Sequence, residues 1–438
     1  MRSVGFGALN LPNKESTACE LMIIGAGMAG MASALFAANR GLSTALIGRT
    51  GETVFASGLL DLLGIHPVEE KKWWLDPWAG IDKLCQDIPN HPYARLKRDD
   101  IRHAFEEVLS FLNEAGCHYV GRKARNCDVL TPIGTRKRTY RVTKSMWPGV
   151  EALEEKHPCL LVDFEGLREF NAGQIVSTLK TEWPDLRTIR ILFPGMDHIS
   201  ELHTGLMAQA MEVRENREKL AQAIRPHVEN AHSVGMPAIL GMYSTNKILA
   251  ELEDQIGVPV FEIPTLPPSV PGLRLKETFE SQLSSRGIKL FLQKQVVEVA
   301  PSAGSGFDLK TGNEESEHHV RAKGVVLASG RFLGGGLVAE RKGIRETVFN
   351  LPVHQPRDRK NWHRLDPLDS RGHAVNRAGL EIDDQFRPVD NSGHPAFRNL
   401  FAAGSILAHQ DWMRMKCGSG LAIATAYGAV NGFLKLNR

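Results

Sequence analysis

The segment Gly25-Ala26-Gly27-Met28-Ala29-Gly30 contains the residues whose types and spacing point most directly to chemistry. In a turn between a strand and a helix, Gly25 permits the tight bend, Gly27 lets the backbone approach a pyrophosphate, and Gly30 lets the helix pack on the strand. The amide groups at the start of that helix then point toward the phosphates. The segment predicts a dinucleotide-binding turn; the alternative is a glycine turn that holds no ligand.

Such a turn works only if a strand precedes it and a helix follows it. The apolar run 21–24, the small-residue stretch 31–41 and the apolar run 45–47 fit the first strand, the helix and the second strand of a βαβ unit. The uncharged stretch 21–39 also reaches the length of a membrane-spanning helix. Its glycines favour the βαβ unit over a membrane span.

The end of the second strand departs from the usual dinucleotide-binding pattern. That position commonly carries an acidic residue that binds the ribose hydroxyls, whereas here the chain reads Ile47-Gly48-Arg49-Thr50. Arg49 leaves three interpretations open: it binds a 2′-phosphate, it stacks on adenine, or it is a solvated strand end. The missing carboxylate predicts altered binding of the adenosine half of a cofactor.

Later segments repeat the pattern of a strand that closes on small residues. They are the strand 325–327 with Ala328-Ser329-Gly330, the strand before Gly404-Ser405, and the helix that Gly418-Ser419-Gly420 opens. In two-lobed flavoproteins the first of these strands returns to the dinucleotide sheet, and the last helix points its N-terminus at the flavin ring. Ser405 stands where such enzymes have an acid on the ribityl chain. We expect a flavoprotein with altered cofactor binding, and the residues leave both FMN and FAD open.

Composition narrows the class of protein. The chain has 438 residues, of which 42% are apolar and 24% charged, so it can bury a sizeable core and is not intrinsically disordered. Lys and Arg exceed Asp and Glu by 53 − 50 = 3, too little for a nucleic-acid-binding surface. The six cysteines show no Cys-x-x-Cys spacing, so we expect no metal site and a reducing compartment. The first twenty residues lack the apolar core of a signal peptide.

These elements predict an α/β protein with an FAD/NAD(P)-binding, Rossmann-like, two-lobed flavoprotein fold and an inserted α/β region. The expected division is an N-terminal extension (1–19), a flavin-binding domain (20–65 and 285–438) and an inserted cap or partner-binding region (66–284). No membrane-spanning helix is expected in this chain.

Four longer stretches are more specific than the glycine pattern: Phe55–Leu63, Thr131–Thr135, Leu266–Leu275 and Gly334–Glu346. They resemble the B-subunit of the bacterial anaerobic glycerol-3-phosphate dehydrogenase, from about residue 20 to the C-terminus. The resemblance implies a quinone-linked complex that oxidises sn-glycerol 3-phosphate to dihydroxyacetone phosphate in fumarate or nitrate respiration. It implies FMN on this chain, a second flavoprotein subunit, an iron–sulfur subunit that anchors the complex, and a peripheral place on the cytoplasmic side of the inner membrane.

The motifs and the resemblance together give a set of candidate cofactor-binding residues. They are Gly25, Gly27, Gly30, Ser57, Gly58, Val297, Ala328, Gly330, Gly404, Ser405, Gly418 and Gly420. For the substrate phosphate the candidates are Arg274, Arg341 and Arg345, because a guanidinium binds phosphate through two parallel hydrogen bonds. Each of these arginines has the alternative of a surface charge or an intersubunit ion pair.

No catalytic base stands out from the sequence. The candidates by residue type are His66, His91, His354, His373 and His409. If the partner flavoprotein oxidises the alcohol, this chain relays electrons and needs no base. Two further alternatives are a stand-alone flavin oxidoreductase related to fumarate reductases and a scaffold protein of the complex without flavin.

Overall fold

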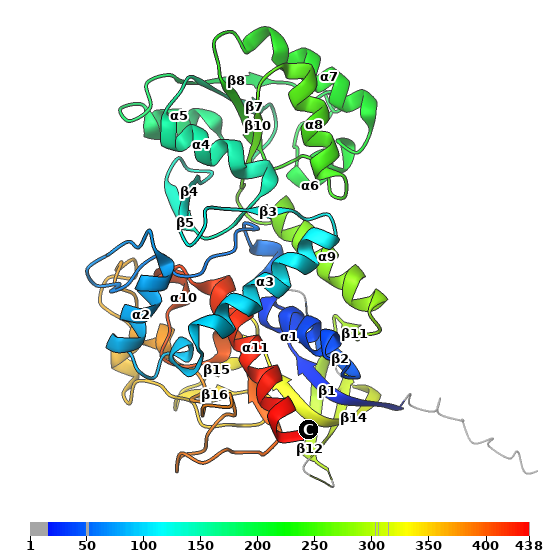
Figure 1. The fold of residues 1–438 in the computed structure, drawn as a ribbon, viewed down its shortest axis with the longest axis vertical. Helices are drawn as coiled ribbons and strands as arrows, with labels where there is room; N and C mark the ends of the chain where they lie inside the picture. The colour runs from blue at the N-terminus through cyan, green and yellow to red at the C-terminus, as the bar shows by residue number, and fades with distance from the viewer. Residues whose placement is uncertain (1–15, 50–51, 303, 305, 314, 438) are drawn as a thin grey trace, which may run out of the picture.

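The computed structural model describes the chain apart from residues 1–15, 50–51, 303, 305, 314 and 438. The described residues form two lobes stacked along the long axis (Figure 1). The first lobe contains a seven-stranded sheet and the second a four-stranded sheet. The predicted extension 1–19 lies mostly outside the described residues, and its last four residues, 16–19, belong to the first strand.

The sheet of the first lobe follows the order β11-β2-β1-β14-β13-β12, with β17 paired to β14. Strands β1, β2, β11, β14 and β17 pair in parallel, and β12, β13 and β14 form an antiparallel ribbon. Their bounds are β1 Ser16–Ile24, β2 Thr44–Gly48, β11 Lys289–Leu292, β12 Gln295–Pro301, β13 Phe307–Gly312, β14 Ser316–Leu327 and β17 Leu400–Ala402. This sheet explains why runs such as 21–24 and 325–327 are wholly apolar, because parallel strands are covered on both faces.

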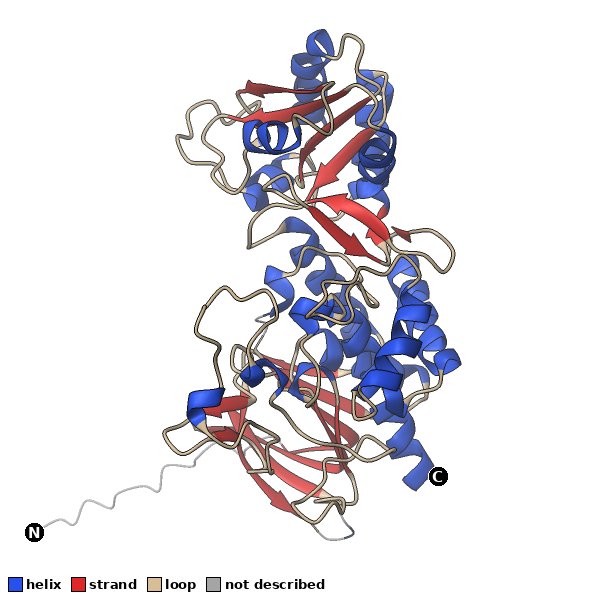
Figure 2. Cartoon of the chain, turned by 90° about the vertical axis from the view of Figure 1, so that its left-hand side faces the viewer, coloured by secondary structure: helices blue, strands red, loops and turns tan. Residues whose placement is uncertain are grey.

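Helices of the first lobe gather on one side of that sheet (Figure 2). Helix α1 packs along α11, and α11 also packs on α3. The helix bounds are α1 Met28–Asn39, α2 Pro77–Asp87, α3 Arg98–Glu114, α9 Val270–Ser285, α10 Trp412–Met415 and α11 Gly418–Asn437. Small residues line α1 and α11, which lets the two helices approach each other and the sheet closely.

The second lobe is a parallel sheet in the order β10-β9-β7-β8 with helices packed around it. Its elements are α4 Trp147–Glu155, β7 Cys159–Phe164, α5 Ala172–Leu179, β8 Leu186–Ile191, α6 Thr204–Ala210, α7 Arg214–Ile224, β9 Ser233–Pro237, α8 Thr245–Ile256 and β10 Val260–Ile263. Short two-stranded pieces complete the chain: β3 Tyr119–Val120 with β6 Val142–Thr143, β4 Cys127–Leu130 with β5 Arg136–Thr139, and β15 Leu337–Ala339 with β16 Ile344–Glu346. An inserted α/β region is thus present.

The buried apolar side chains form two separate main clusters. The cluster of the first lobe includes residues of α2, α3 and α9, such as Trp78, Phe111 and Phe279. The cluster of the second lobe runs from Leu130 to Ile263. The apolar cluster of the second lobe covers a shorter stretch of the chain than 66–284, because the cluster of the first lobe includes apolar residues between 68 and 112 and between 275 and 283.

The uncharged stretch 21–39 is divided between β1 and α1. Within the described residues, no helix combines the length and the apolar character needed to cross a membrane. The six cysteines are free thiols.

Candidate functional site

The three glycines of the β1–α1 turn have different surroundings. Gly25 has φ +123°, and a Cβ there would lie 2.0 Å from the carbonyl oxygen of Ala328. A Cβ on Gly30 would lie 1.7 Å from the carbonyl oxygen of Gly25, whereas a Cβ on Gly27 would meet no described atom within 4 Å. Gly25 and Gly30 are therefore required by the packing of the protein itself, and Gly27 faces space that a ligand can fill.

The start of α1 fits an anionic group at this place. Gly27 is the N-cap, so no side chain caps the helix, and the first turn of the helix holds no acidic residue. The amide groups of the first helical turn carry a partial positive charge, and no described side chain accepts their hydrogen bonds. Together with the open space over Gly27, this donor set fits the phosphate part of a flavin nucleotide.

The end of β14 lies directly beside the turn. The amide of Ala328 donates to the carbonyl of Ile24 at 2.7 Å. The hydroxyl of Ser329 is buried and has no hydrogen-bond partner among the described residues. A Cβ on Gly336 would lie 2.2 Å from the oxygen of Gly330 and 2.5 Å from Oγ of Ser329. The loop of three consecutive glycines, 334–336, is thus folded against the same strand end.

The turn after β17 reaches the same place from the other side. Gly404 has φ +81°, and a Cβ there would lie 2.6 Å from Cβ of Ala29 in α1. Its amide donates to Oγ1 of the buried Thr425 at 2.8 Å. Ser405 follows and is half-buried. Gly25, Ala328 and Gly404, which are far apart in the sequence, therefore meet around the start of α1.

Arg331 supports this turn and was not among the predicted residues. Its side chain is 9% exposed, and it donates to the carbonyls of Ser405 (2.7 Å), Gln410 (2.7 Å) and Leu407 (3.3 Å) and to that of Asn376. A guanidinium with several carbonyl acceptors fixes the path of a loop. The only signal in the sequence was an arginine placed directly after Ala328-Ser329-Gly330.

The start of α11 packs on the chain segment that follows Ser57 and Gly58. Oγ of Ser419 accepts a hydrogen bond from the amide of Asp61 at 2.6 Å, and a Cβ on Gly420 would lie 2.6 Å from the oxygen of Asp61. A Cβ on Gly418 would lie 2.9 Å from the ring of Trp412. The predicted helix-opening glycines thus lie in a tight contact between α11 and residues 59–62.

Ser57 and Gly58 lie against the beginning of α9. Gly58 has φ +73°, and a Cβ there would lie 2.5 Å from Cβ of Pro271. Oγ of Ser269 donates to the carbonyl of Ala56 at 2.5 Å. Val297 is placed differently: it sits at a bulge in β12, the last strand of the sheet path, and its side chain is 43% exposed.

The three candidate phosphate-binding arginines do not share one site. Arg274 is buried, and its guanidinium contacts both carboxylate oxygens of Glu262 (2.7 and 2.8 Å) and the carbonyl of Gly241 (2.7 Å). Arg345 is exposed and pairs with Glu340 at 2.9 Å. Arg341 is exposed in the turn between β15 and β16. The fork of Arg274 is therefore occupied by Glu262, because a buried guanidinium needs a carboxylate partner.

The five candidate histidines do not all meet in one site. Nε2 of His66 lies 3.0 Å from Asp87, and His373 contacts the amide of Arg364 and the carbonyl of Pro367. Burial lowers the pKa of His91 to about 3, and the positive charges of neighbouring groups act in the same direction. His354 and His409 are brought together on Glu381.

Comparison with known proteins shows which families the chain resembles. Residues 20–421 match the family described as FAD binding domain. A relative from Halobacterium salinarum, named as a probable B-subunit of anaerobic glycerol-3-phosphate dehydrogenase, is 32% identical, covering 94% of this chain and 96% of its own. The B-subunit of the anaerobic glycerol-3-phosphate dehydrogenase of Aliivibrio fischeri is 28% identical, with 95% of both chains covered. A solved structure, the 3-ketosteroid delta1-dehydrogenase of Sterolibacterium denitrificans, is 12% identical with a TM-score of 0.44, covering 96% and 100%.

Proposed function

Since the chain belongs to the FAD binding domain family and to the family of anaerobic glycerol-3-phosphate dehydrogenase B-subunits, we propose that it is the flavin-carrying component of such a dehydrogenase complex. The complex would oxidise sn-glycerol 3-phosphate to dihydroxyacetone phosphate and pass the electrons to the quinone pool. As one part of an oxidoreductase, the chain would act together with other subunits rather than alone.

The observation that carries this proposal is the open space over Gly27 at the start of α1. Gly25 and Gly30 are enclosed by protein atoms, and Gly27 is not. A phosphate bound there would accept hydrogen bonds from the first amides of α1 and lie beside Ser329, whose buried hydroxyl lacks a partner among the described residues.

When bound, the flavin supplies a ring that accepts a hydride or electrons and passes them on. The chain's own residues would hold it in place. The turn at Gly25–Gly30 would bind its phosphate, and the turn at Gly404–Ser405, fixed by Arg331, would lie along the ribityl chain. The other proposed contacts are Ser57, Gly58, Val297, Ala328, Gly330, Gly418 and Gly420.

We further propose FMN as the flavin. The family's description points to FAD, but two residues that usually hold an FAD are replaced: the strand β2 ends in Gly48-Arg49, and Ser405 stands in place of a carboxylate. Arg49 is exposed. Release of the cofactor with acid and identification by mass decides between the two flavins.

The partners in this proposal are a second flavoprotein subunit and an iron–sulfur subunit that anchors the complex at the cytoplasmic face of the inner membrane. The relatives' designation as B-subunits supports a complex of several chains. Arg341 and Arg345, both exposed, stay candidates for binding the substrate phosphate or an acidic partner.

The test begins with the absorption spectrum of the purified chain and of Gly27→Val. The wild type is expected to hold about one flavin, whereas Gly27→Val should lose it and keep its fold, since the added side chain meets only the space proposed for the ligand. Gly205→Val is the matched control: a Cβ at Gly205, in α6, also meets no described atom within 4 Å. It should retain the flavin.

The outcomes separate the alternatives. A wild-type chain that stays colourless with FMN and FAD, even in the presence of its partners, would favour the scaffold alternative. Reduction of an artificial acceptor by the chain alone would favour a stand-alone oxidoreductase. Glycerol 3-phosphate oxidation that requires the reconstituted complex and is lost with Gly27→Val would support the proposal.

A further inference from the structure

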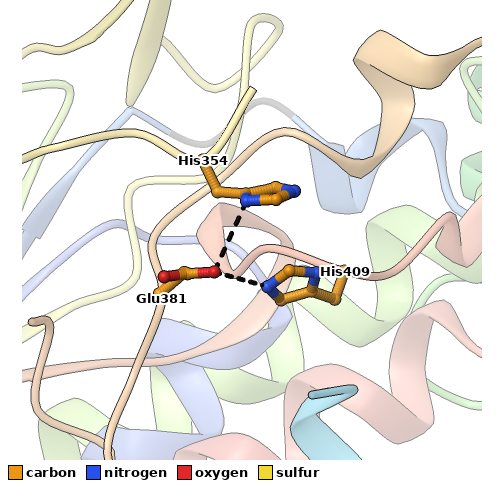
Figure 3. A group of neighbouring side chains, drawn as sticks. All are labelled: His354, Glu381 and His409. Carbon is orange, nitrogen blue, oxygen red and sulfur yellow. Dashed lines mark hydrogen bonds and ion pairs between the residues drawn. The ribbon is translucent and has the colours of Figure 1, made fainter. Parts of the chain in front are cut away.

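We propose that His354, Glu381 and His409 bind a divalent transition-metal ion of the zinc type, a site that lies outside the flavin-binding turn. Nδ1 of His354 lies 3.4 Å from Oε1 of Glu381, and Nε2 of His409 lies 2.9 Å from the same oxygen. Both imidazoles face this one carboxylate oxygen (Figure 3). Two imidazoles and one carboxylate are a common ligand set for Zn²⁺ and Fe²⁺.

Backbone pairing places the three side chains together. His354 and Gly379 exchange amide–carbonyl hydrogen bonds of 2.8 and 3.1 Å, and Leu380 pairs with Ile406 and Ala408 at 2.9 Å. Glu381 and His409 directly follow Leu380 and Ala408. Three short segments, distant in sequence, therefore lie side by side and bring their ligands to one point. The arrangement does not depend on a single flexible loop.

The backbone at His409 lies in the left-handed region. Its φ is +62°, which few non-glycine residues adopt, with Asn, Asp and His the most frequent among them. Such strain persists where the surrounding structure fixes it, often at functional positions. Here the amide of His409 is held by the carbonyl of Arg377 at 3.0 Å.

The distances allow an ion to enter with small side-chain movements. The ligand atoms all lie within 4.8 Å of one another. In a zinc site with ligand bonds of about 2.0–2.2 Å, neighbouring ligand atoms are about 3.3–3.5 Å apart. The imidazoles would rotate toward the ion, which would replace the present contacts to Glu381. At least one coordination position would stay open to water.

The charges around the cluster permit a cation. His354 lines a cavity of about 680 Å³ whose lining also includes the cations Arg357, Lys360, Arg364, Arg371 and Arg377. Four of these cations have carboxylate partners: Arg371 lies 2.6 Å and Arg364 4.0 Å from Asp369, Arg377 3.1 Å from Glu69, and Lys360 3.9 Å from Asp358. Glu381, in contrast, makes its described side-chain contacts only with the two imidazoles. Its negative charge is available to the ion.

The test uses the full-length chain after treatment with a chelator, titrated with Zn²⁺ against a chromogenic zinc indicator. We expect one tight site, with affinity reduced at least about 100-fold in Glu381→Gln and in His409→Asn, because each removes one of three ligands. Asn is chosen for position 409 because it tolerates a positive φ. Circular dichroism of the ion-free variants checks that they are folded.

His363→Asn is the matched control, since His363 is exposed and lines the same cavity without belonging to the cluster. It should bind Zn²⁺ as the wild type does. Wild-type affinity no tighter than that of Glu381→Gln would overturn the proposal, and so would an equal loss of affinity in His363→Asn. Binding is measured directly, so the result does not depend on whether the chain holds flavin or is active.

Discussion

Arg274 and Glu262 form a buried, two-pronged ion pair that joins α9 to β10. Their side chains are 7% and 0% exposed, and the two nitrogen–oxygen distances are 2.7 and 2.8 Å. Glu262 also accepts hydrogen bonds from Oγ of Ser145 (2.6 Å) and the amide of Leu240 (2.8 Å). Since α9 packs in the core of the first lobe and β10 in that of the second, the pair links the two lobes.

Replacement of Arg274 alone should destabilise the protein strongly. Burial acts to raise the pKa of Glu262, but the charge and hydrogen bonds of Arg274, with those of Ser145 and Leu240, lower it below its usual range. Arg274→Met would leave this carboxylate buried without its cation. We expect the free energy of unfolding, measured with urea, to fall by about 3–5 kcal/mol.

The double variant Arg274→Met/Glu262→Leu tests the cause. Removal of both charges should restore much of the stability, because a buried ion pair often contributes little beyond an apolar pair of similar size. If the double variant loses as much free energy of unfolding as the two single variants combined, the ion-pair explanation is wrong. Arg214→Ala is a suitable reference, since the pair of Arg214 with Glu218 is exposed and should contribute at most about 0.5 kcal/mol.

Arg331→Lys should weaken the turn that carries Gly404 and Ser405. A lysine keeps the charge but has no planar fork, so it cannot satisfy the carbonyls that Arg331 reaches. We expect the free energy of unfolding to fall by about 2–4 kcal/mol. Flavin binding should become about tenfold weaker, measured by the fluorescence of flavin released during dialysis. Arg345→Lys, at the exposed middle position of β16, should change neither quantity. Unchanged flavin binding in Arg331→Lys would show that Ser405 does not need this support.

The flavoprotein fold could be predicted from local sequence because each element has a local cause. The apolar runs 21–24 and 325–327 form β1 and the end of β14, and Gly418-Ser419-Gly420 opens α11. The two-lobed α/β architecture follows from such elements in order. The extent of the apolar core of the second lobe could not be predicted from local sequence. Whether residues 66–112 pack on one sheet or the other depends on contacts between distant segments.

The side chains of the site were predicted less well than its backbone turns. The expected phosphate ligand Arg274 is bound to Glu262, a residue 12 positions earlier on β10 that only the tertiary fold brings near. Arg331 could not be predicted because its acceptors are main-chain carbonyls of residues 376–410. Every residue has such a carbonyl, so the residue types do not indicate the contact. His354, Glu381 and His409 meet through backbone pairing of three short segments, and no spacing in the sequence signals it.

Gly30→Ala should destabilise the fold, unlike Gly27→Val. The added methyl group would lie 1.7 Å from the carbonyl oxygen of Gly25, so either α1 or the turn must move. We expect a loss of at least about 2–3 kcal/mol in unfolding free energy together with loss of flavin. Gly205→Ala, where the space is open and the residue is helical, should instead be neutral or stabilising by up to about 1 kcal/mol. A stable, flavin-loaded Gly30→Ala would contradict the close packing of α1 on β1.

His91 should make stability fall as the solution becomes acidic. The residue is fully buried, Nδ1 accepts a hydrogen bond from the amide of Tyr93 at 3.2 Å, and Nε2 has no partner among the described residues. Burial lowers its pKa to about 3, aided by the positive charges of His66, His409 and Arg377. An unfolded histidine has a pKa of about 6.5, so between these values the unfolded chain binds one more proton than the folded chain.

Stability carried by neutral His91 is therefore complete above about pH 6.5 and is lost toward pH 3, at up to about 1.4 kcal/mol per pH unit. His91→Asn keeps an acceptor for Tyr93 but cannot be protonated. Urea unfolding at pH 7 and pH 5.5 should show the wild type losing about 1 kcal/mol more than the variant over this interval. His103→Asn, at an exposed position of α3, should keep the wild-type pH dependence. Equal slopes in the wild type and His91→Asn would mean that His91 is protonated as easily in the folded chain as in the unfolded one, against its burial.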